Sequence, residues 1–264
     1  MRARLQVLLV SVLALLAWAG SARALSIAPG SETLFTQLER SDTALLARFA
    51  GAEPGFVTFV VDQVLQGRAG SEARVKLSEG QTTLSGLEPG RRYLLLLADL
   101  PDGSFALPLD SLSILSVPER DLPETLAAVR AWDREGQDPA AKRATLMRFA
   151  TARSLFLQDS AVMGLTHLRL MNRDALRDLM EPMVSGRIAH PRARETLVRF
   201  AGVMGATEHR ERLMDRVRDV GETQALREAA LFALHAMDPE AARELEPTLA
   251  ANAGLNALMR SLER

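Results

Sequence analysis

The sequence has 264 residues, of which 47% are hydrophobic, a formal net charge of -1 at pH 7 and no cysteine. The lack of cysteine excludes disulfides, thiol chemistry, cysteine-based metal sites and a lipid attached through an N-terminal cysteine. Nearly all of the positive charge is arginine, and it is interleaved with acidic residues instead of clustered. This pattern argues against a nucleic-acid-binding protein.

The first 24 residues have the layout of an export signal. Two arginines precede an apolar run over 7–19, and small residues precede Leu25. The run is shorter than the roughly 20 apolar residues that cross a bilayer, so an uncleaved anchor is the less favoured alternative. We predict a signal peptide over 1–24, a mature chain without a membrane span, and a periplasmic or extracellular location.

The next segment, residues 25–118, has the pattern of a small β-domain. A short helical signal follows Ser31, and two apolar runs flank a turn over 51–55, which is typical of a hairpin. Strands are predicted over 43–50, 56–65, 74–77, 93–98, 104–109 and 112–117. Five or six short strands with one flanking helix predict a β-barrel or sandwich.

Three motifs in this segment resemble those of small exported bacterial domains with a netrin-like, OB-type barrel. They are a V-L-x-G corner at 64–67, the strand G-R-R-Y-L-L-L-L at 90–97, and Asp102-Gly103 in a hairpin turn. The resemblance covers about residues 40–117 and implies a barrel fold. Some netrin-like domains inhibit metalloproteases through an N-terminal cysteine. That role is not carried over, because the mature chain begins with Leu25.

The barrel offers one candidate ligand site, formed by Arg91, Arg92 and Tyr93. Two adjacent arginines beside the single tyrosine of the chain suit a small anionic ligand, whereas a solvated hairpin corner is the competing and favoured interpretation. The phenylalanines of this segment lie among valines at strand spacing. They therefore indicate core packing and not the stacking surface of a nucleic-acid-binding OB-fold.

Residues 122–264 have the pattern of a helical repeat array. Three apolar runs recur at steps of 32 and 34 residues, which is typical of paired helices that stack. The runs are Leu165, Leu168 and Met171; Leu197, Phe200 and Val203; and Leu231, Leu234 and Met237. Helical pairs are predicted over 159–173 with 174–186, 191–205 with 208–220, and 222–237 with 239–251. Helices over 123–135 and 140–157 form an irregular capping pair, and a helix over 255–262 ends the array.

In repeat length and in the spacing of Leu, Ala and Val, this region resembles HEAT-type α-helical repeats. The resemblance implies a superhelix that binds a protein or peptide partner on the face lined by the second helix of each pair. The candidate partner-binding residues on those helices are Arg177, Arg216, Arg218 and Arg243. Pairing of these arginines with nearby acidic residues is the competing and favoured interpretation.

No motif of a known catalytic or metal site occurs, and the four histidines, at 167, 190, 209 and 235, lack the spacing of metal ligands. We therefore predict an α+β protein with two domains, no cofactor, no metal and no enzymatic activity, acting as an exported protein-binding adaptor. A module that binds a small anionic ligand on the barrel is the first alternative. A hydrolase with an unrecognised site is the second.

Overall fold

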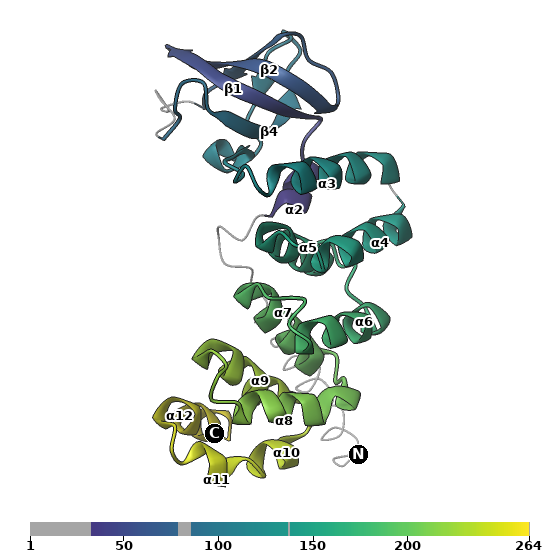
Figure 1. Cartoon of the computed structure of the whole chain (residues 1–264), viewed down its shortest axis with the longest axis vertical. Coiled ribbons are helices and arrows are strands. Elements are labelled where there is room, and N and C mark those ends of the chain that lie inside the picture. Colours follow the sequence, from purple (N-terminus) through teal and green to yellow (C-terminus); the bar gives the residue numbers. More distant parts are fainter. Residues whose placement is uncertain (1–32, 79–85, 137, 264) are drawn as a thin grey trace, which may run out of the picture. The chain divides into compact units, whose positions relative to one another are not determined.

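The computed structural model describes residues 33–78, 86–136 and 138–263 (Figure 1). These residues belong to one compact unit that begins at Thr33. The predicted signal peptide and the predicted helix cap Ser31 lie outside the described ranges. Within those ranges, no helix combines the length and the apolar character that crossing a membrane requires.

A closed β-barrel occupies the first part of the described chain, as predicted. Its strands are β1 (Thr43–Glu53), β2 (Phe56–Gln66), β3 (Glu72–Lys76), β4 (Arg92–Asp99), β5 (Phe105–Ala106) and β6 (Ile114–Leu115). Five of them follow one another in the order β1-β2-β3-β5-β4, and pairing of β4 with β1 closes the barrel. The β3–β5 pair is parallel and the other pairs are antiparallel, including the addition of β6 to β4.

Strand β4 shows why the sequence over 93–97 is apolar without alternation. Tyr93 and Leu95 belong to the core inside the barrel. Leu94 and Leu96 belong to a second core, which the barrel shares with the helices. Because successive side chains of a strand point to opposite faces, both faces of β4 are buried.

Two turns fix the ends of the strands. Gly67, in the V-L-x-G corner after β2, has a φ of 73°, and an added Cβ would lie 2.4 Å from Thr43 Oγ1, so only glycine fits this corner. The strand predicted over 104–109 is shorter than expected. The Leu109 N–H donates to Ser113 Oγ at 3.0 Å, and the chain turns into a 3-10 helix, η2 (Asp110–Ser113).

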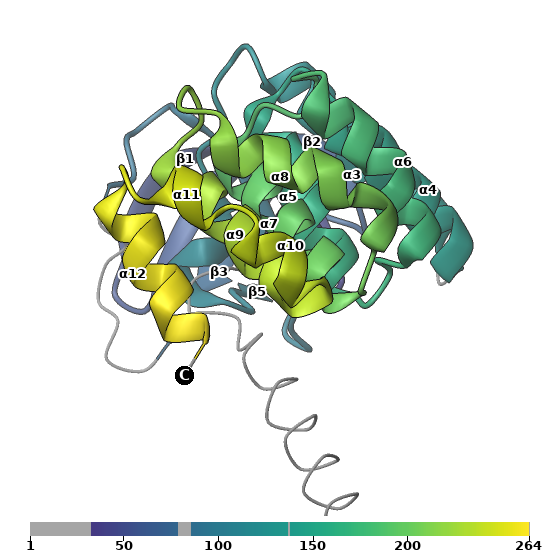
Figure 2. The same cartoon turned by 90° about the horizontal axis from the view of Figure 1, so that it is seen from below.

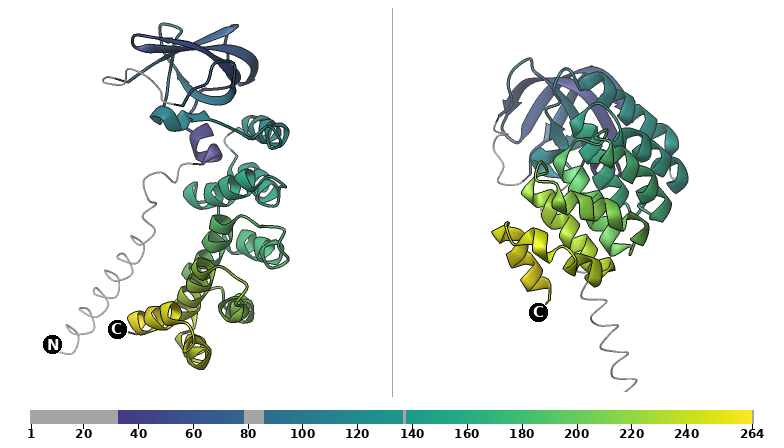
Figure 3. Two further views of the ribbon diagram at one scale, coloured as in Figure 1. Left: turned by 60° about the vertical axis from the view of Figure 1, so that its left-hand side comes forward. Right: turned by 60° about the horizontal axis from the view of Figure 1, so that its bottom comes forward.

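Helices make up most of the remaining described chain, so the α+β class with a barrel followed by a helical region is confirmed (Figure 2). They are α2 (Leu34–Leu38), α3 (Leu122–Glu135), α4 (Pro139–Ala150), α5 (Leu155–His167), α6 (Arg173–Val184), α7 (Pro191–Val203), η3 (Thr207–His209), α8 (Arg210–Arg218), α9 (Gln224–Met237), α10 (Pro239–Arg243), α11 (Glu246–Leu249) and α12 (Ala253–Leu262). We refer to α5, α7 and α9 as the first helices and to α6, α8 and α10 as the second helices. First helices pack on one another, α5 on α7 and α7 on α9; α7 also contacts α6, α9 contacts α8 and α10, and α5 contacts α4 (Figure 3).

Three helix predictions have wrong boundaries, and the helix expected over 159–173 is α5, which begins at Leu155 and ends at His167. The helix expected over 140–157 ends at Ala150, because the Ser154 side chain accepts a hydrogen bond from the third residue of α5 at 3.4 Å and so caps a new helix. The helix expected over 239–251 is two short helices, α10 and α11, with Pro247 in the first turn of the second. Helix caps and prolines, and not the spacing of apolar residues, therefore set these helix ends.

Helix α2 precedes the barrel in sequence, but it packs among the helices. Its N-cap is Thr33. The ring centroid of Phe35 lies 5.1 Å from that of Trp132 in α3 and 6.2 Å from that of Phe149 in α4. On α5, Gly164 leaves space for this contact, since an added Cβ would lie 3.3 Å from Phe35 Cβ. The start of the described chain thus completes the core that the barrel and the helices share.

Candidate functional site

Arg91, Arg92 and Tyr93 are adjacent in sequence, and the structure places the Arg91 guanidinium carbon 6.0 Å from the centroid of the Tyr93 ring, whereas Arg92 pairs with Asp62. Tyr93 is 3% exposed, and its hydroxyl accepts a hydrogen bond from the Glu88 N–H at 2.9 Å. Arg91 Nη1 lies 2.9 Å from Glu88 Oε1, and Arg91 Nη2 donates to Ser116 Oγ at 2.8 Å. Tyr93 therefore belongs to the barrel core, and Arg91 holds the hairpin corner.

Arg92 lies on the outer surface of the barrel beside a second arginine. Asp62 Oδ1 is 2.9 Å from Arg48 Nε, and Asp62 Oδ2 is 3.4 Å from Arg92 Nε. The Asp62 carboxylate thus forms ion pairs with two half-exposed guanidinium groups. The anionic-ligand site expected at this corner stays a prediction.

The four arginines expected to form a partner-binding stripe lie on second helices, and all four are ion-paired. The contacts are Arg177 Nη2 to Asp174 Oδ1 at 3.1 Å, Arg216 Nη1 to Glu222 Oε1 at 2.6 Å, Arg218 Nη1 to Asp215 Oδ1 at 3.8 Å, and Arg243 Nε to Glu263 Oε1 at 3.7 Å. This arrangement matches the pairing interpretation. Acidic side chains of the same chain therefore neutralise the charge of these four arginines.

Other arginines join successive second helices. Arg173, at the start of α6, binds both carboxylate oxygens of Glu208 at 3.0 and 2.8 Å, and these hydrogen bonds lower the pKa of Glu208 to about 2. Arg210 of α8 lies 2.9 Å from Glu244, which follows α10. The partners are 35 and 34 residues apart, so the arginines connect one helix pair to the next.

A further arginine cluster is mostly buried. Glu222, in the loop between α8 and α9, accepts hydrogen bonds from Arg194 of α7 and Arg216 of α8, and its side chain is 10% exposed. Burial by itself raises the pKa of Glu222, but the hydrogen bonds from Arg194 and Arg216 outweigh this effect and lower it. The cluster ties α7 and α8 to the start of α9.

The first helices differ from the second, because each exposes a large apolar side chain. Leu155 of α5 is 46% exposed, Val203 of α7 is 57% exposed and Phe232 of α9 is 38% exposed. In the part of the chain that the structure describes, no second helix has such an exposed side chain. We define the α5–α7–α9 face as the side of these helices that carries Met163, Thr196, Arg199, Val203 and Phe232.

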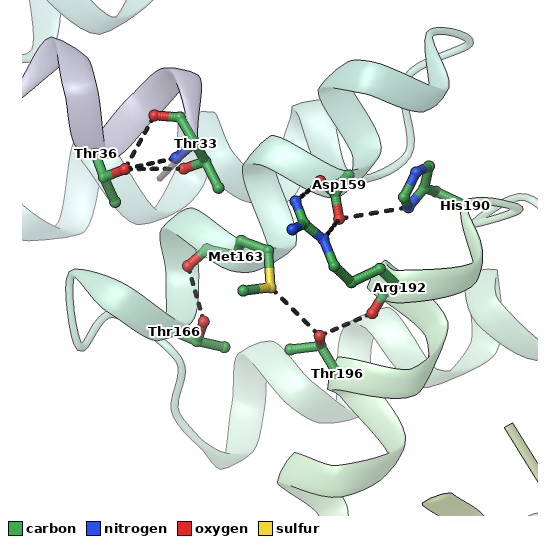
Figure 4. Close-up of polar contacts among 8 residues, drawn as sticks. All are labelled: Thr33, Thr36, Asp159, Met163, Thr166, His190, Arg192 and Thr196. Carbon is green, nitrogen blue, oxygen red and sulfur yellow. Dashed lines mark hydrogen bonds and ion pairs between the residues drawn. The ribbon is translucent and has the colours of Figure 1, made fainter. Parts of the chain in front are cut away.

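Direct contacts join α5 to α7 on this face (Figure 4). Met163 Sδ of α5 lies 3.4 Å from Thr196 Oγ1 of α7. One turn earlier on both helices, Asp159 accepts a hydrogen bond from Arg192 Nε at 2.7 Å. The charge of Arg192 is therefore neutralised on the face itself.

Val203 and Phe232 emerge on the same side of the contact between α7 and α9. Gly202 faces Ala233 so closely that an added Cβ would lie 2.6 Å from Ala233 Cα. The two helices run in the same direction, because the buried arginine cluster joins their N-terminal ends. Val203 follows the contact residue Gly202, and Phe232 precedes the contact residue Ala233. In parallel helices, these two positions point to the same side of the contact.

Arg199 lies between these apolar residues. It follows Thr196 by three positions and precedes Val203 by four, so the three share one side of α7. Phe232 follows Arg199 by 33 residues, the separation that also relates Met163 to Thr196 across α5 and α7. Among the described residues, the Arg199 guanidinium has no hydrogen-bond or ion-pair partner.

Two histidines lie near charged groups, at separate places. His190 Nδ1 is 3.4 Å from Asp159 Oδ1, beside Arg192 (Figure 4). His209 is 4% exposed, and burial lowers its pKa. Over the described ranges, no group of three or more His, Asp or Glu side chains is placed to hold a metal ion.

Val203 belongs to the same apolar run of the sequence as Leu197, but the two residues differ in exposure. Leu197 is fully buried, whereas Val203 is 57% exposed. A step of three residues falls about 60° short of a full helical turn, so two such steps rotate Val203 about 120° away from Leu197. The spacing of Arg192, Thr196, Arg199 and Val203 along one side of α7 was the signal for the exposed face.

No protein-family model matches this chain, and no curated protein or solved structure matches it either. The structure shows a five-stranded closed barrel followed by helices. The likenesses to netrin-like barrels and to HEAT repeats rest on the sequence patterns given above.

Proposed function

We propose that the chain is an exported, non-enzymatic adaptor that holds a peptide segment of another protein on the α5–α7–α9 face. One observation carries this proposal: Val203 and Phe232 are exposed on the same side of the close contact between α7 and α9. Single exposed apolar residues are common on folded proteins, but two that emerge together from packed helices are typical of an interaction surface.

The chemistry of the face suits a protein segment. Covering apolar surface contributes about 25 cal/mol per Å², and aromatic side chains are frequent energetic centres of interfaces. Phe232 is therefore the residue from which we expect the largest contribution. Met163 adds an unbranched side chain that adapts to the shape of a partner.

The second helices suit a partner less well. Their arginines hold Asp174, Glu208, Asp215 and Glu244 in ion pairs, several of which connect neighbouring helices. A partner that used these arginines would have to displace the internal carboxylates. We therefore place the partner on the first helices and not on the second.

The type of barrel, the type of helical repeat and the location of the protein are part of the same proposal. Closure of five strands and the obligatory Gly67 support a netrin-like, OB-type barrel. Contacts between first helices at a separation of 33 residues support HEAT-like repeats. The export pattern over 1–24 supports a periplasmic or extracellular location. Mass spectrometry of the secreted chain tests the predicted export and cleavage, with Leu25 as the expected first residue.

Site-specific photo-crosslinking in cells tests the binding face. A photo-reactive amino acid replaces Val203 or Phe232 in the full-length chain, and Asp215 on α8 is the matched exposed control. We expect the first two positions to crosslink to one and the same protein and position 215 to give none of that product. Crosslinks only from position 215, or from no position, would contradict the proposal.

A further inference from the structure

The α5–α7–α9 face contains one cation that the chain itself does not neutralise. Arg192 is held by Asp159. Arg199, two turns further along α7, has no ion-pair or hydrogen-bond partner among the described residues. Because Arg199 is exposed, water solvates its guanidinium, whose N–H donors are therefore open to an acceptor from outside the chain.

The nearest acidic side chains on the same helices do not change this. Glu195 precedes Arg199 by one turn on α7, yet the two residues form no ion pair in the described structure. Glu228 precedes Phe232 by one turn on α9 and accepts a hydrogen bond from Gln224 Nε2 at 2.9 Å. Arg199 thus remains available to a group from outside the chain.

We propose that the peptide bound on this face carries a carboxylate side chain flanked by apolar side chains, and that Arg199 binds this carboxylate. The inference rests on the proposed function, since it names the chemistry of the segment that the face holds. Val203 lies one turn from Arg199 on the same side of α7, and Phe232 directly precedes Ala233, which packs against Gly202. A carboxylate that reaches Arg199 therefore places the residues beside it over two apolar side chains.

The guanidinium geometry adds selectivity to this arrangement. Arginine presents parallel N–H donors that match the two oxygens of a carboxylate, and such charge-assisted pairs are stronger than neutral hydrogen bonds. When the peptide covers Val203 and Phe232, it also excludes water from around the pair, which strengthens the attraction. An amide in place of the carboxylate loses most of this interaction.

Peptide selection on the full mature chain tests the inference. A random library of 12-residue peptides displayed on phage is selected against residues 25–264, and the enriched peptides are synthesised. Their Kd is measured by fluorescence anisotropy against the unchanged protein, Arg199→Gln and Phe232→Ser. Arg130→Gln, on α3 outside the face, is the matched control for loss of an exposed arginine. Circular dichroism melting curves confirm that each variant is folded.

We expect peptides enriched in Asp or Glu beside Leu, Ile or Phe. Arg199→Gln raises their Kd about tenfold and Arg130→Gln leaves it unchanged, in line with a charged pair that is partly shielded from water. Peptides with Asn or Gln in place of the acid bind both the unchanged protein and Arg199→Gln equally weakly.

Two other results separate the inference from the proposed function. Peptides that need Phe232 but show no acidic preference, and bind Arg199→Gln as well as the unchanged protein, overturn the inference and leave the proposed binding face intact. If no selected peptide depends on Phe232, both the binding face and the role of Arg199 are wrong.

Discussion

The first helices α5, α7 and α9 expose Leu155, Val203 and Phe232, whereas the second helices α6 and α8 cover their outer surface with ion pairs. The second helices contain seven arginines and the first helices four, three of them on α7. On the second helices the arginines have carboxylate partners, and on α7 Arg199 has none among the described residues. The comparison teaches that arginines paired with carboxylates mark the connecting surface, whereas Arg199, unpaired in the described part of the chain, marks the proposed binding surface.

The difference follows from what each surface contacts. Exposed ion pairs contribute little to stability one by one, but pairs between neighbouring helices fix their relative register. Apolar residues on an exposed helix contribute nothing to folding and retain their binding energy for a partner. The second helices therefore connect neighbouring repeats, and recognition by the first helices is our proposal.

The most disruptive change is expected at the contact that holds the first helices together. Gly202→Val places a side chain 2.6 Å from Ala233 Cα and forces α7 away from α9. We expect the free energy of unfolding to fall by about 3 kcal/mol, measured by urea denaturation. Gly51→Val, in β1, is the control, since no heavy atom lies within 4 Å of its added Cβ. Equal effects of the two changes would show that α7 and α9 are not so closely packed in solution.

A second large effect is expected at Gln158, which is 3% exposed. Its amide donates to the carbonyls of Ala152 and Arg187 and accepts from the N–H groups of Ala189 and His190. Gln158→Leu leaves these backbone groups without partners, so we expect a loss of about 2 kcal/mol in a thermal or urea unfolding experiment.

The matched change for Gln158 is Gln224→Leu, at an exposed position that also forms side-chain hydrogen bonds. There water replaces the lost partners, and we expect a loss below about 0.5 kcal/mol. A loss as large as that of Gln158→Leu would contradict the role of burial.

Within the second helices, the effect of losing an arginine depends on burial. Arg216 is 20% exposed and binds Glu222, which is 10% exposed. Arg218 is 45% exposed and faces Asp215, which is 68% exposed. We expect Arg216→Gln to lower the free energy of unfolding by about 1–2 kcal/mol and Arg218→Gln by less than about 0.5 kcal/mol, as measured by urea denaturation. A larger loss of unfolding free energy for Arg218→Gln than for Arg216→Gln would contradict the role of burial in these ion pairs.

The smallest effect concerns pH. The folded-state pKa of Glu208 is about 2, below the ordinary value of 4.5, because Arg173 donates hydrogen bonds to the carboxylate. The ion pair therefore stabilises the fold above pH 4.5 and loses this contribution as the pH falls toward 2. NMR titration of the Glu208 carboxyl measures the shift, and Arg173→Gln is expected to return the pKa toward 4.5. An unchanged titration in that variant would refute the pairing.

Local patterns predicted much of the fold. Alternation and turn residues predicted most of the strands within a few residues, and a capping residue with apolar spacing predicted α3. The signal in Ser154 was missed, because the apolar run over 146–157 continues across the cap. The candidate site was less predictable, since Val203 has the same spacing as buried residues of its run and only packing decides which side it faces.

By itself, the sequence determined the order of strands and helices, because each element depends on side chains two to four positions apart. Tertiary structure alone decided that β1 pairs with β4 to close the barrel, and that Asp159 neutralises Arg192 while Arg199 stays free. The partners in these contacts lie on different elements, 33 residues apart for Asp159 and Arg192. No local periodicity specifies which of many acidic side chains meets a given arginine, so pairing and exposure are properties of the packed chain.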